Sequence, residues 1–318
     1  MIGISIGDAN GVGPEILLRA YKNKSLTGAF MAIGDFSVLN FCNNYLALDV
    51  LIHKMDGIED IKPGSLSIYD VAKLSEKDIT IGQISKKTGF ASLNYVETGT
   101  QLALQKHIDA LVTLPINKEA IRGTVKDFSG HTGYIASLCN TTNYTMMLVS
   151  EKLIVTHVST HVSLRKAIDQ VRRERILNVI RLTDTALKKL GKSLRIAVAG
   201  LNPHAGENNS FGYEDSEEIA PAVKMAIEQG MKATGPLAAD TVFYQAKKGL
   251  FDAVVCMYHD QGHIPIKLLD FEAAVNVTLG LPVVRTSVDH GTAFDIAYKG
   301  IASTSSLCNA FELAKKLI

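Results

Sequence analysis

Short apolar runs recur along the chain, and longer amphipathic segments separate them. The runs that we interpret as strands are centred on Ser5, Ile33, Ile52, Thr113, Met147, Thr156, Val198, Val255 and Val277. Many of them are apolar throughout, which is typical of strands covered on both faces. Their alternation with helical segments predicts an α/β fold with a layered α/β/α architecture and a mostly parallel sheet.

The helical segments have recognisable ends. The first begins at Pro14, a residue suited to the first turn of a helix, and two later ones stop directly before a glycine. Besides that first helix, the pattern predicts helices over residues 92–107, 164–190, 215–229 and 305–318.

One pair of strands departs from the parallel pattern. The runs around Met147 and Thr156 are separated only by Ser150, Glu151 and Lys152. A connection this short predicts an antiparallel hairpin.

The length of 318 residues fits two domains or one large α/β unit. No internal repeat and no linker-like stretch marks a boundary. We predict a discontinuous first domain, residues 1–118 plus 286–318, and a second domain over residues 119–285.

Charge and composition exclude several classes of protein. The net charge is +1, so no long-range field favours nucleic acid or a membrane surface. No apolar stretch approaches the roughly 18 residues that span a bilayer. The strand-like Ile2–Ile6 lacks the basic flank of a signal peptide, and the four cysteines lie far apart as buried thiols do. A cytoplasmic location is expected.

Three predicted strands are followed closely by a histidine: His161, His204 and His259. Ligands of open α/β sheets bind beyond the carboxyl ends of the strands, and imidazole is a common ligand of zinc and similar ions. Three such residues leave a coordination position open, as a catalytic metal requires. A single histidine of this kind is more often structural, and the long spacing matches no local metal motif.

Two further segments are candidates for binding an anion. Lys267, Asn276 and Arg285 lie among apolar residues, where a buried charge needs a partner; solvated surface charges are the alternative. His131 and Thr132 precede a short predicted helix, whose first N–H groups suit a phosphate or carboxylate. Capping of that helix by Thr132 is the alternative.

The glycines Gly7, Gly11 and Gly13 lie between a strand and a helix but do not have the GxGxxG spacing of a dinucleotide fingerprint. A tight turn with close backbone packing explains them. The residues that bind a nicotinamide cofactor are therefore not identified by this segment.

Taken together, these segments resemble the 4-hydroxythreonine-4-phosphate dehydrogenase (PdxA) family of vitamin B6 biosynthesis. The matching stretches run from residue 3 to beyond residue 297 and are GDANGVGPE, LPINKEA, SGHTGY, HVSTH, LNPHAGEN, GPLAADTVF, YHDQGHIPIK and VNVTLGLPVVRTSVDHGTAFDIA. NPHAGE, YHDQG and RTSVDHGTA are highly specific.

The resemblance implies a site and an assembly. It assigns His161, His204 and His259 to one divalent metal (zinc, magnesium, manganese or cobalt), and His131, Thr132, Lys267, Asn276 and Arg285 to the substrate. It implies a homodimer with the active site at the subunit interface, and a fold like that of isocitrate and isopropylmalate dehydrogenases. Asp240 is a candidate base or metal-tuning group, with a structural carboxylate as the alternative.

The implied reaction is the NAD(P)-dependent oxidation of a small phosphorylated hydroxy acid, followed by decarboxylation. The metal would lower the pKa of the substrate hydroxyl, and the anion-binding residues would orient the substrate. The commoner first loop of the family reads GDPAGIGPE, whereas this chain has Ala9 and Asn10 in it. Several motifs look closer to a subgroup that acts on 4-phospho-D-threonate or 4-phospho-D-erythronate.

Three alternatives remain. The substrate could be 4-phosphohydroxy-L-threonine of pyridoxal 5'-phosphate biosynthesis. The chain could be a non-redox protein that binds a phosphorylated acid, as the related phosphotransacetylases do, although acyl transfer does not call for three histidines. A structural zinc protein is disfavoured, because such sites are usually closed by four ligands and rich in cysteine.

Overall fold

The computed structural model describes residues 1–128, 130–270 and 273–318, and these divide into two compact units. The first comprises Met1–Thr142, Leu281–Lys316 and Ile318, and the second comprises Asn143–Gly280 and Leu317. The second domain was expected to cover residues 119–285. In the structure, residues 119–142 and 281–285 belong to the first unit.

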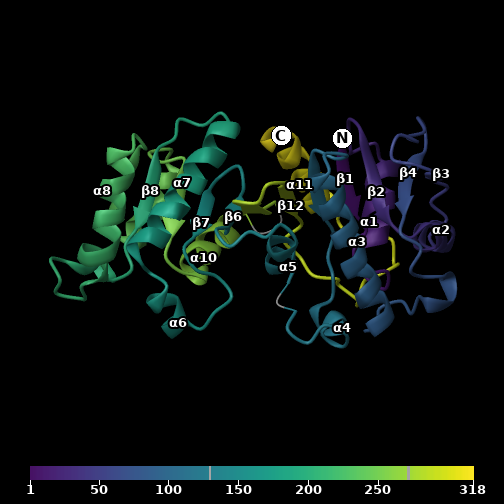
Figure 1. The fold of residues 1–318 in the computed structure, drawn as a ribbon, viewed down its shortest axis with the longest axis horizontal. Coiled ribbons are helices and arrows are strands. Elements are labelled where there is room, and N and C mark those ends of the chain that lie inside the picture. The colour runs from purple at the N-terminus through teal and green to yellow at the C-terminus, as the bar shows by residue number, and fades with distance from the viewer. Residues whose placement is uncertain (129, 271–272) are drawn as a thin grey trace. The chain divides into compact units, whose positions relative to one another are not determined.

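The sheet of the first unit is parallel throughout the described strands. Their spatial order is β3 (Ile52–Lys54), β4 (Leu66–Asp70), β2 (Phe30–Gly34), β1 (Ile2–Ser5), β5 (Ala110–Thr113) and β12 (Val284–Ser287) (Figure 1). The last residues of β1, β5 and β12 are in register, with Thr113 opposite both Ser5 and Ser287. The carboxyl ends of these strands therefore form one edge, where ligands of such sheets bind.

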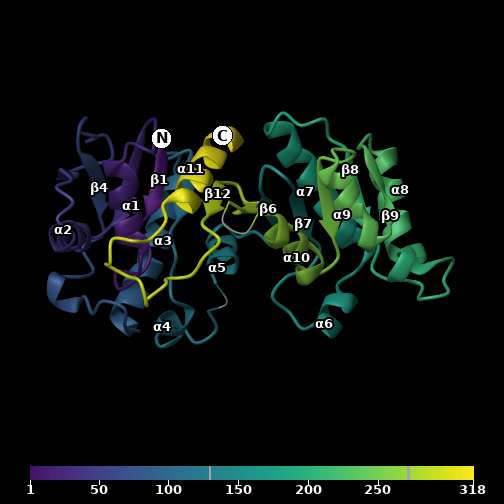
Figure 2. The same cartoon turned by 180° about the vertical axis from the view of Figure 1, so that it is seen from behind.

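Helices cover both faces of this sheet (Figures 1 and 2). Val96 and Leu102 of α3 share a core cluster with Met31 of β2 and Leu111 of β5. On the other face Phe30 meets Phe311 edge-on, with ring centroids 5.5 Å apart. The helices of the unit are α1 (Gly13–Lys22), α2 (Phe36–Tyr45), the 3₁₀ turn η1 (Glu76–Asp78), α3 (Lys86–Leu104), α4 (Lys118–Arg122), α5 (His131–Leu138) and α11 (Ser305–Leu317).

Two tight contacts account for the glycines after β1. A Cβ on Gly7, which has φ +75°, would lie 2.4 Å from the carbonyl oxygen of Pro115. A Cβ on Gly13 would lie 2.2 Å from the carbonyl oxygen of Ile6. Only glycine tolerates the left-handed conformation at the first of these positions and the close backbone approach at both.

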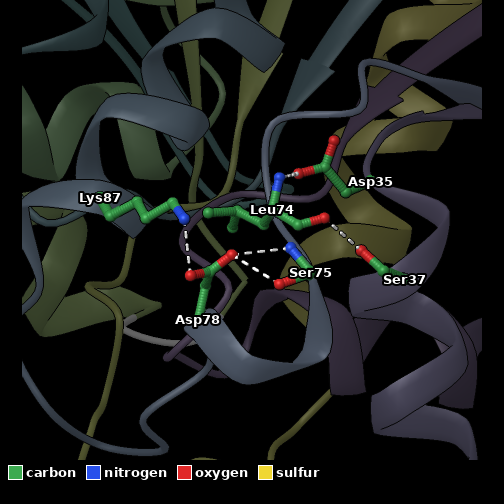
Figure 3. Close-up of polar contacts among 6 residues, drawn as sticks. All are labelled: Asp35, Ser37, Leu74, Ser75, Asp78 and Lys87. Atoms are coloured by element: carbon green, nitrogen blue, oxygen red, sulfur yellow. Dashed lines mark hydrogen bonds and ion pairs between the residues drawn. The ribbon is translucent and has the colours of Figure 1, made fainter.

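The connection after β4 is tied to the end of β2 by side-chain carboxylates (Figure 3). Asp35 accepts a hydrogen bond from the backbone N–H of Leu74 at 2.7 Å. Asp78 accepts from both the N–H and the hydroxyl of Ser75 at 2.8 Å, and from Lys87 at 2.6 Å. These contacts satisfy backbone donors that the loop would otherwise leave to water.

The sheet of the second unit is mixed. Its spatial order is β11 (Val275–Leu279), β6 (Thr145–Val149), β7 (Ile154–His157), β10 (Ala253–Cys256), β8 (Ile196–Ala199) and β9 (Ala233–Leu237). β6 is antiparallel to both β11 and β7, and the remaining neighbours are parallel. The expected hairpin is confirmed, and the Ser150 hydroxyl accepts from the N–H of Leu153 at its turn.

Alternate strand residues of this unit face different helices. Val155, Ala197 and Val254 belong to a core cluster with α9 and α10, whereas the Thr156 hydroxyl lies 2.9 Å from that of Thr183 on α7. Since side chains alternate along a strand, His157 points to the same face as Val155. The helical elements are α6 (Leu164–Asp169), α7 (Arg173–Lys189), the 3₁₀ turn η2 (Pro203–Gly206), the π-helical turn η3 (Asp215–Ile219), α8 (Ala220–Glu228), α9 (Ala239–Lys247) and α10 (His259–Leu269).

The single helix expected over residues 164–190 is wrong, because it is broken between α6 and α7. Arg172 is extended, and the N–H of Arg173 donates to Glu218 at 2.7 Å. A carboxylate from a distant segment thus satisfies a first-turn donor and fixes a new helix start.

No helix among the described residues is both long and apolar enough to cross a bilayer.

Candidate active site

The three histidines expected to bind a metal all follow strands of the second unit. His161 comes four residues after the end of β7, His204 lies in η2 beyond β8, and His259 is the first residue of α10 beyond β10. Because β7, β10 and β8 are parallel neighbours, their carboxyl ends lie at one edge of the sheet.

Four imidazoles gather at this edge, and we call His157, His161, His259 and His263 the imidazole cluster. The ring centroids of His161 and His259 are 5.4 Å apart. The rings of His259 and His263 are stacked at 3.5 Å with an interplanar angle of 11°. His263 in turn reaches His157, with 3.1 Å between Nδ1 of the former and Nε2 of the latter.

His259 is arranged as metal-binding histidines usually are. Its Nδ1 lies 2.6 Å from a carboxylate oxygen of Asp260, so Nδ1 carries the hydrogen and donates it. The Nε2 then has its lone pair available, and a carboxylate behind an imidazole is the common outer contact of a metal ligand. Among the described residues, no group of three or more potential ligands lies within reach of one ion.

His204 occupies a strained loop. Its φ is 53°, and Ala205 and Glu207 also have positive φ values. Asp215 fixes the loop by accepting from the backbone N–H groups of Leu201 at 2.9 Å and Asn202 at 3.0 Å. The ring of His204 is exposed and lies 6.3 Å from that of Phe211. Its backbone strain is of the kind that collects at functional sites.

Imidazole nitrogen is a ligand type that suits a divalent cation of borderline softness, and His161, His204 and His259 would be the residues to hold it, with the Nε2 of His259 already an acceptor. The structure brings the first and third of these residues together. It records no contact between His204 and the imidazole cluster within the described residues.

The first unit holds a separate set of anion-binding candidates. Arg285 of β12 is buried, and its Nη2 donates to the hydroxyl of Thr113 at 2.7 Å. Burial lowers the pKa of this guanidinium to about 9. Because an arginine keeps its charge at neutral pH, the site places a desolvated positive charge near the carboxyl end of β5.

His131 begins α5 and is electrostatically coupled to Arg285. Its pKa lies well below the ordinary value, chiefly because of burial and further because of the positive charges of Arg285 and Lys118. Its Nε2 is buried, and no hydrogen-bond partner for it exists among the residues that the structure describes. A neutral imidazole with an unsatisfied nitrogen next to cations suits an anionic ligand. Thr132 follows in the same helical turn.

The other three candidates lie in the second unit. Asn276 is on β11, and its Oδ1 is a buried acceptor with no partner within the described part of the chain. Lys267 is partly buried on α10, four residues after His263. Asp240 is exposed in the first turn of α9, and nothing in the described structure brings its carboxylate to the imidazole cluster.

Sequence reasoning missed His263 and Lys118 and did not assign His157 to the site. The available signal was the four-residue spacing of His259 and His263, which places both on one helix face. Gly262 and Pro265 obscured it, because both disfavour a helix and α10 contains them. Lys118 lies close to the start of α5, since a Cβ built on Gly130 would be 3.5 Å from its Nζ. The expected SGHTGY segment begins at Ser129, which is outside the described residues.

Comparisons with known proteins show which family the chain resembles over nearly its full length. A family model described as "Pyridoxal phosphate biosynthetic protein PdxA" matches residues 27–314. The D-threonate 4-phosphate dehydrogenase of Salmonella typhimurium is 41% identical over 99% of this chain and 98% of its own length. The enzyme of the same name from Cupriavidus necator is 41% identical over 100% of this chain and 97% of its own length.

Solved structures give the same result. A crystal structure of 4-hydroxythreonine-4-phosphate dehydrogenase from Klebsiella pneumoniae is 40% identical, with a TM-score of 0.86 over 100% of this chain and 99% of the other. An isocitrate dehydrogenase from Methylococcus capsulatus aligns with a TM-score of 0.51 at 13% identity, over 99% of this chain and 87% of the other. That second likeness concerns the fold alone, and it confirms the expected architecture.

Proposed function

The chain belongs to the PdxA family, and on that premise we propose that it is an NAD(P)-dependent dehydrogenase of a 4-phosphorylated four-carbon hydroxy acid. Relatives with about two fifths of their residues identical over nearly the full length carry dehydrogenase names, which supports the redox chemistry. The observation that carries the substrate class is the buried guanidinium of Arg285 together with the buried Nε2 of His131. Together they offer a desolvated positive charge and an unsatisfied imidazole nitrogen to an anion.

D-Threonate 4-phosphate is the proposed substrate, with D-erythronate 4-phosphate as its close analogue. Two of the full-length relatives are named for the first of these activities. Ala9 and Asn10 in the first loop also separate this chain from the commoner family pattern. The alternative is 4-phosphohydroxy-L-threonine, which has an amino group in place of a hydroxyl at the neighbouring carbon.

The anion-binding residues would hold the phosphate and carboxylate of this acid. Arg285 supplies a planar fork of donors, and His131 supplies a nitrogen that is fixed as neutral by burial and by its cationic neighbours. Thr132, Lys267 and Asn276 add a hydroxyl, an ammonium and an amide. Holding both ends of a short substrate limits the orientation of its reacting C–H bond relative to the nicotinamide.

Oxidation takes place at the 3-hydroxyl in this proposal. The hydrogen on C3 is transferred as hydride to NAD(P)+, and a base takes up the hydroxyl proton. Asp240 is the candidate for this base. The resulting 3-keto acid then loses its carboxylate as carbon dioxide, and C2 takes up a proton to give dihydroxyacetone phosphate. One divalent cation, held by His161, His204 and His259, would stabilise negative charge on the substrate oxygen in both steps.

A homodimer is part of the proposal. Elements next to the imidazole cluster expose large apolar side chains, among them Ile264 at 63% and Leu268 at 84% of their surface on α10. Leu164 and Phe211 are exposed as well. Exposed apolar residues spaced by one helical turn are typical of a surface that meets another protein. A second copy of this chain is the proposed partner, with metal ligands drawn from both copies.

The test is a side-by-side assay of three substrates. Purified enzyme with a divalent cation is given D-threonate 4-phosphate, D-erythronate 4-phosphate or 4-phosphohydroxy-L-threonine, with NAD+ and NADP+ in turn. We expect absorbance at 340 nm to rise fastest with the first, and dihydroxyacetone phosphate to accumulate. Faster turnover of the hydroxythreonine would overturn the substrate assignment. No reduced cofactor with any of them would favour a non-redox protein that binds a phosphorylated acid.

A further inference from the structure

His157 and His263 lie in the imidazole cluster but have no part in the function proposed above. Both are buried, whereas the His259 side chain keeps 36% of its surface. His157 comes from the end of β7, and His263 is one turn after His259 on α10. Buried imidazoles cost free energy unless their nitrogens are paired, so their partners determine what they do.

The hydrogen bonds of these two rings have a fixed direction. The Nδ1 of His157 lies 3.3 Å from the carbonyl oxygen of Met146, which can only accept, so this nitrogen carries the hydrogen. With its hydrogen on Nδ1, the His157 ring has a lone pair on Nε2, which faces the Nδ1 of His263 at 3.1 Å.

His263 must then be the donor to His157. Its Nδ1 lies 3.1 Å from the Nε2 of His157 and 3.0 Å from the carbonyl oxygen of His259, both of which accept. This assignment is the same whether His263 is neutral or charged, because Nδ1 carries a hydrogen in both forms. The plane of the His263 ring is thereby fixed by two acceptors from different elements.

The packing around the pair is close. A Cβ on Gly262 would lie 2.5 Å from the Nε2 of His157 and 2.9 Å from the Sγ of Cys256. Glycine at this position therefore allows α10 to approach β7 closely enough for the hydrogen bond. The one-turn spacing of His259 and His263 on α10 places their rings face to face at 3.5 Å.

The Nδ1 of His259 makes a further orienting contact with Asp260. The Asp260 side chain is 69% exposed, and water weakens an exposed pair of this kind. The buried contact with His263 is screened less by water. It covers one face of the His259 ring and leaves the ring edge that carries Nε2 for a ligand.

We propose that His157 and His263 are positioning residues, which hold the ring of His259 in the orientation that binds the divalent cation. The order of action runs from the Met146 carbonyl through His157 and His263 to the face of His259. The inference rests on the proposed function, since it requires that His259 binds the metal. Outer contacts of this kind typically change metal affinity by about 10- to 100-fold.

The first test measures hydrogen positions in the wild-type enzyme. Long-range ¹H–¹⁵N spectra of enzyme labelled with ¹⁵N-histidine distinguish the two tautomers of a neutral ring. We expect the Nδ1–H form for His157 and a hydrogen on Nδ1 of His263. A hydrogen on Nε2 of His157 would overturn the proposal, and this result does not depend on the folding of any variant.

The second test measures Co²⁺ and Zn²⁺ affinity by competition with a chromophoric chelator. We expect His263→Leu to bind about 10- to 100-fold more weakly than wild type. His263→Phe, which keeps an aromatic ring against His259 but loses the hydrogen bond, should recover part of this loss. His107→Leu removes an exposed histidine of the first unit and should leave the affinity unchanged.

Failure of the positioning role and failure of the metal assignment give different results in these variants. Loss of binding in His259→Ala, together with unchanged affinity in both His263 variants, overturns the positioning role and leaves the proposed function intact. Unchanged affinity in His259→Ala contradicts the metal assignment and the positioning role together. Weakened binding in both His263→Leu and His259→Ala, with the expected tautomers, supports the proposal.

Discussion

Replacing Asp215 by asparagine should loosen the loop that carries His204 without changing the shape of the side chain. The buried carboxylate accepts from the N–H of Leu201 on Oδ1, and from the N–H and the side-chain amide of Asn202 on Oδ2, all within 2.9–3.0 Å. Asparagine has one acceptor oxygen in place of two. Its better orientation keeps both contacts with Asn202 and turns its NH₂ toward the N–H of Leu201.

The magnitude follows from these contacts. A buried donor left facing another donor costs about 1–3 kcal/mol, and each of the two remaining hydrogen bonds loses about 1 kcal/mol when its acceptor becomes neutral. Burying a neutral amide instead of a carboxylate offsets about 1 kcal/mol. We therefore expect a net loss of about 2–4 kcal/mol, concentrated in the loop around His204.

Hydrogen exchange measured by mass spectrometry follows this loop directly. A loss of about 2–4 kcal/mol in local stability corresponds to roughly 30- to 1,000-fold faster exchange at Leu201 and Asn202. Asp252→Asn is the matched control, because Asp252 accepts from the N–H of Arg195 and the hydroxyl of Ser193, before β8 begins. Wild-type protection of the loop in Asp215→Asn would refute the reasoning.

Three further predictions follow from other contacts. The pKa of His157, about 3 in the folded chain, lies below the value of about 6.5 in the unfolded chain. The unfolded state therefore binds more protons than the folded state between these two pH values. The contribution of His157 to stability is complete above pH 6.5 and is lost as the pH falls toward 3. The wild-type protein should lose unfolding free energy between pH 7 and pH 5, and in His157→Gln this loss should be smaller by about 2 kcal/mol, as measured by urea titration at each pH. Thr113→Val removes the hydroxyl that accepts from Arg285, and should lower stability by about 1.5–3 kcal/mol and raise the KM of the phosphorylated substrate; an unchanged KM would separate this contact from substrate binding. Aspartate at both Ile264 and Leu268, which are exposed in the single chain, should convert a dimer to a folded monomer in sedimentation experiments, and a dimer that survives would place the interface elsewhere.

Much of the fold was predictable because burial on two faces leaves a clear pattern. The strand around Val255 and the hairpin of β6 and β7 are continuously apolar runs with short polar turns, and both are where the sequence places them. The locations of His161, His204 and His259 beyond strand ends followed from the same pattern. The distances between these histidines did not follow from the pattern. They depend on loop conformation, which is set by contacts such as those of Asp215 with the backbone N–H groups of Leu201 and Asn202.

Three strands escaped prediction, and each has a visible physical reason. β9 contains Gly235 and Pro236, which argue against a strand, yet it is the outermost strand of its unit, where a missing N–H is tolerated. β12 is short and carries Arg285, a charge that becomes acceptable in a sheet only when a partner such as Thr113 is nearby. β4 (LSIYD) is the third, because Ser67 and Asp70 interrupt its apolar run.

α10 explains why the site was only partly predicted. Gly262 and Pro265 lower its helix propensity, and tertiary contacts form the helix regardless. The Gln261 side chain accepts from the N–H of Met257 and donates to the carbonyl of Gly200, and Ile266 is buried in the core. His263 becomes recognisable as a neighbour of His259 only once this helix is known.

The most direct test of the central claim is turnover of D-threonate 4-phosphate with NAD+ before and after removal of the metal. The enzyme is stripped with a chelator, assayed, and then titrated with Zn²⁺, Mn²⁺ or Co²⁺ while NADH formation is followed. We expect activity to disappear on stripping and to return in proportion to the ion bound at His161, His204 and His259, with no recovery in His204→Ala. Full turnover by the stripped enzyme, or equal recovery in that variant, would contradict the account.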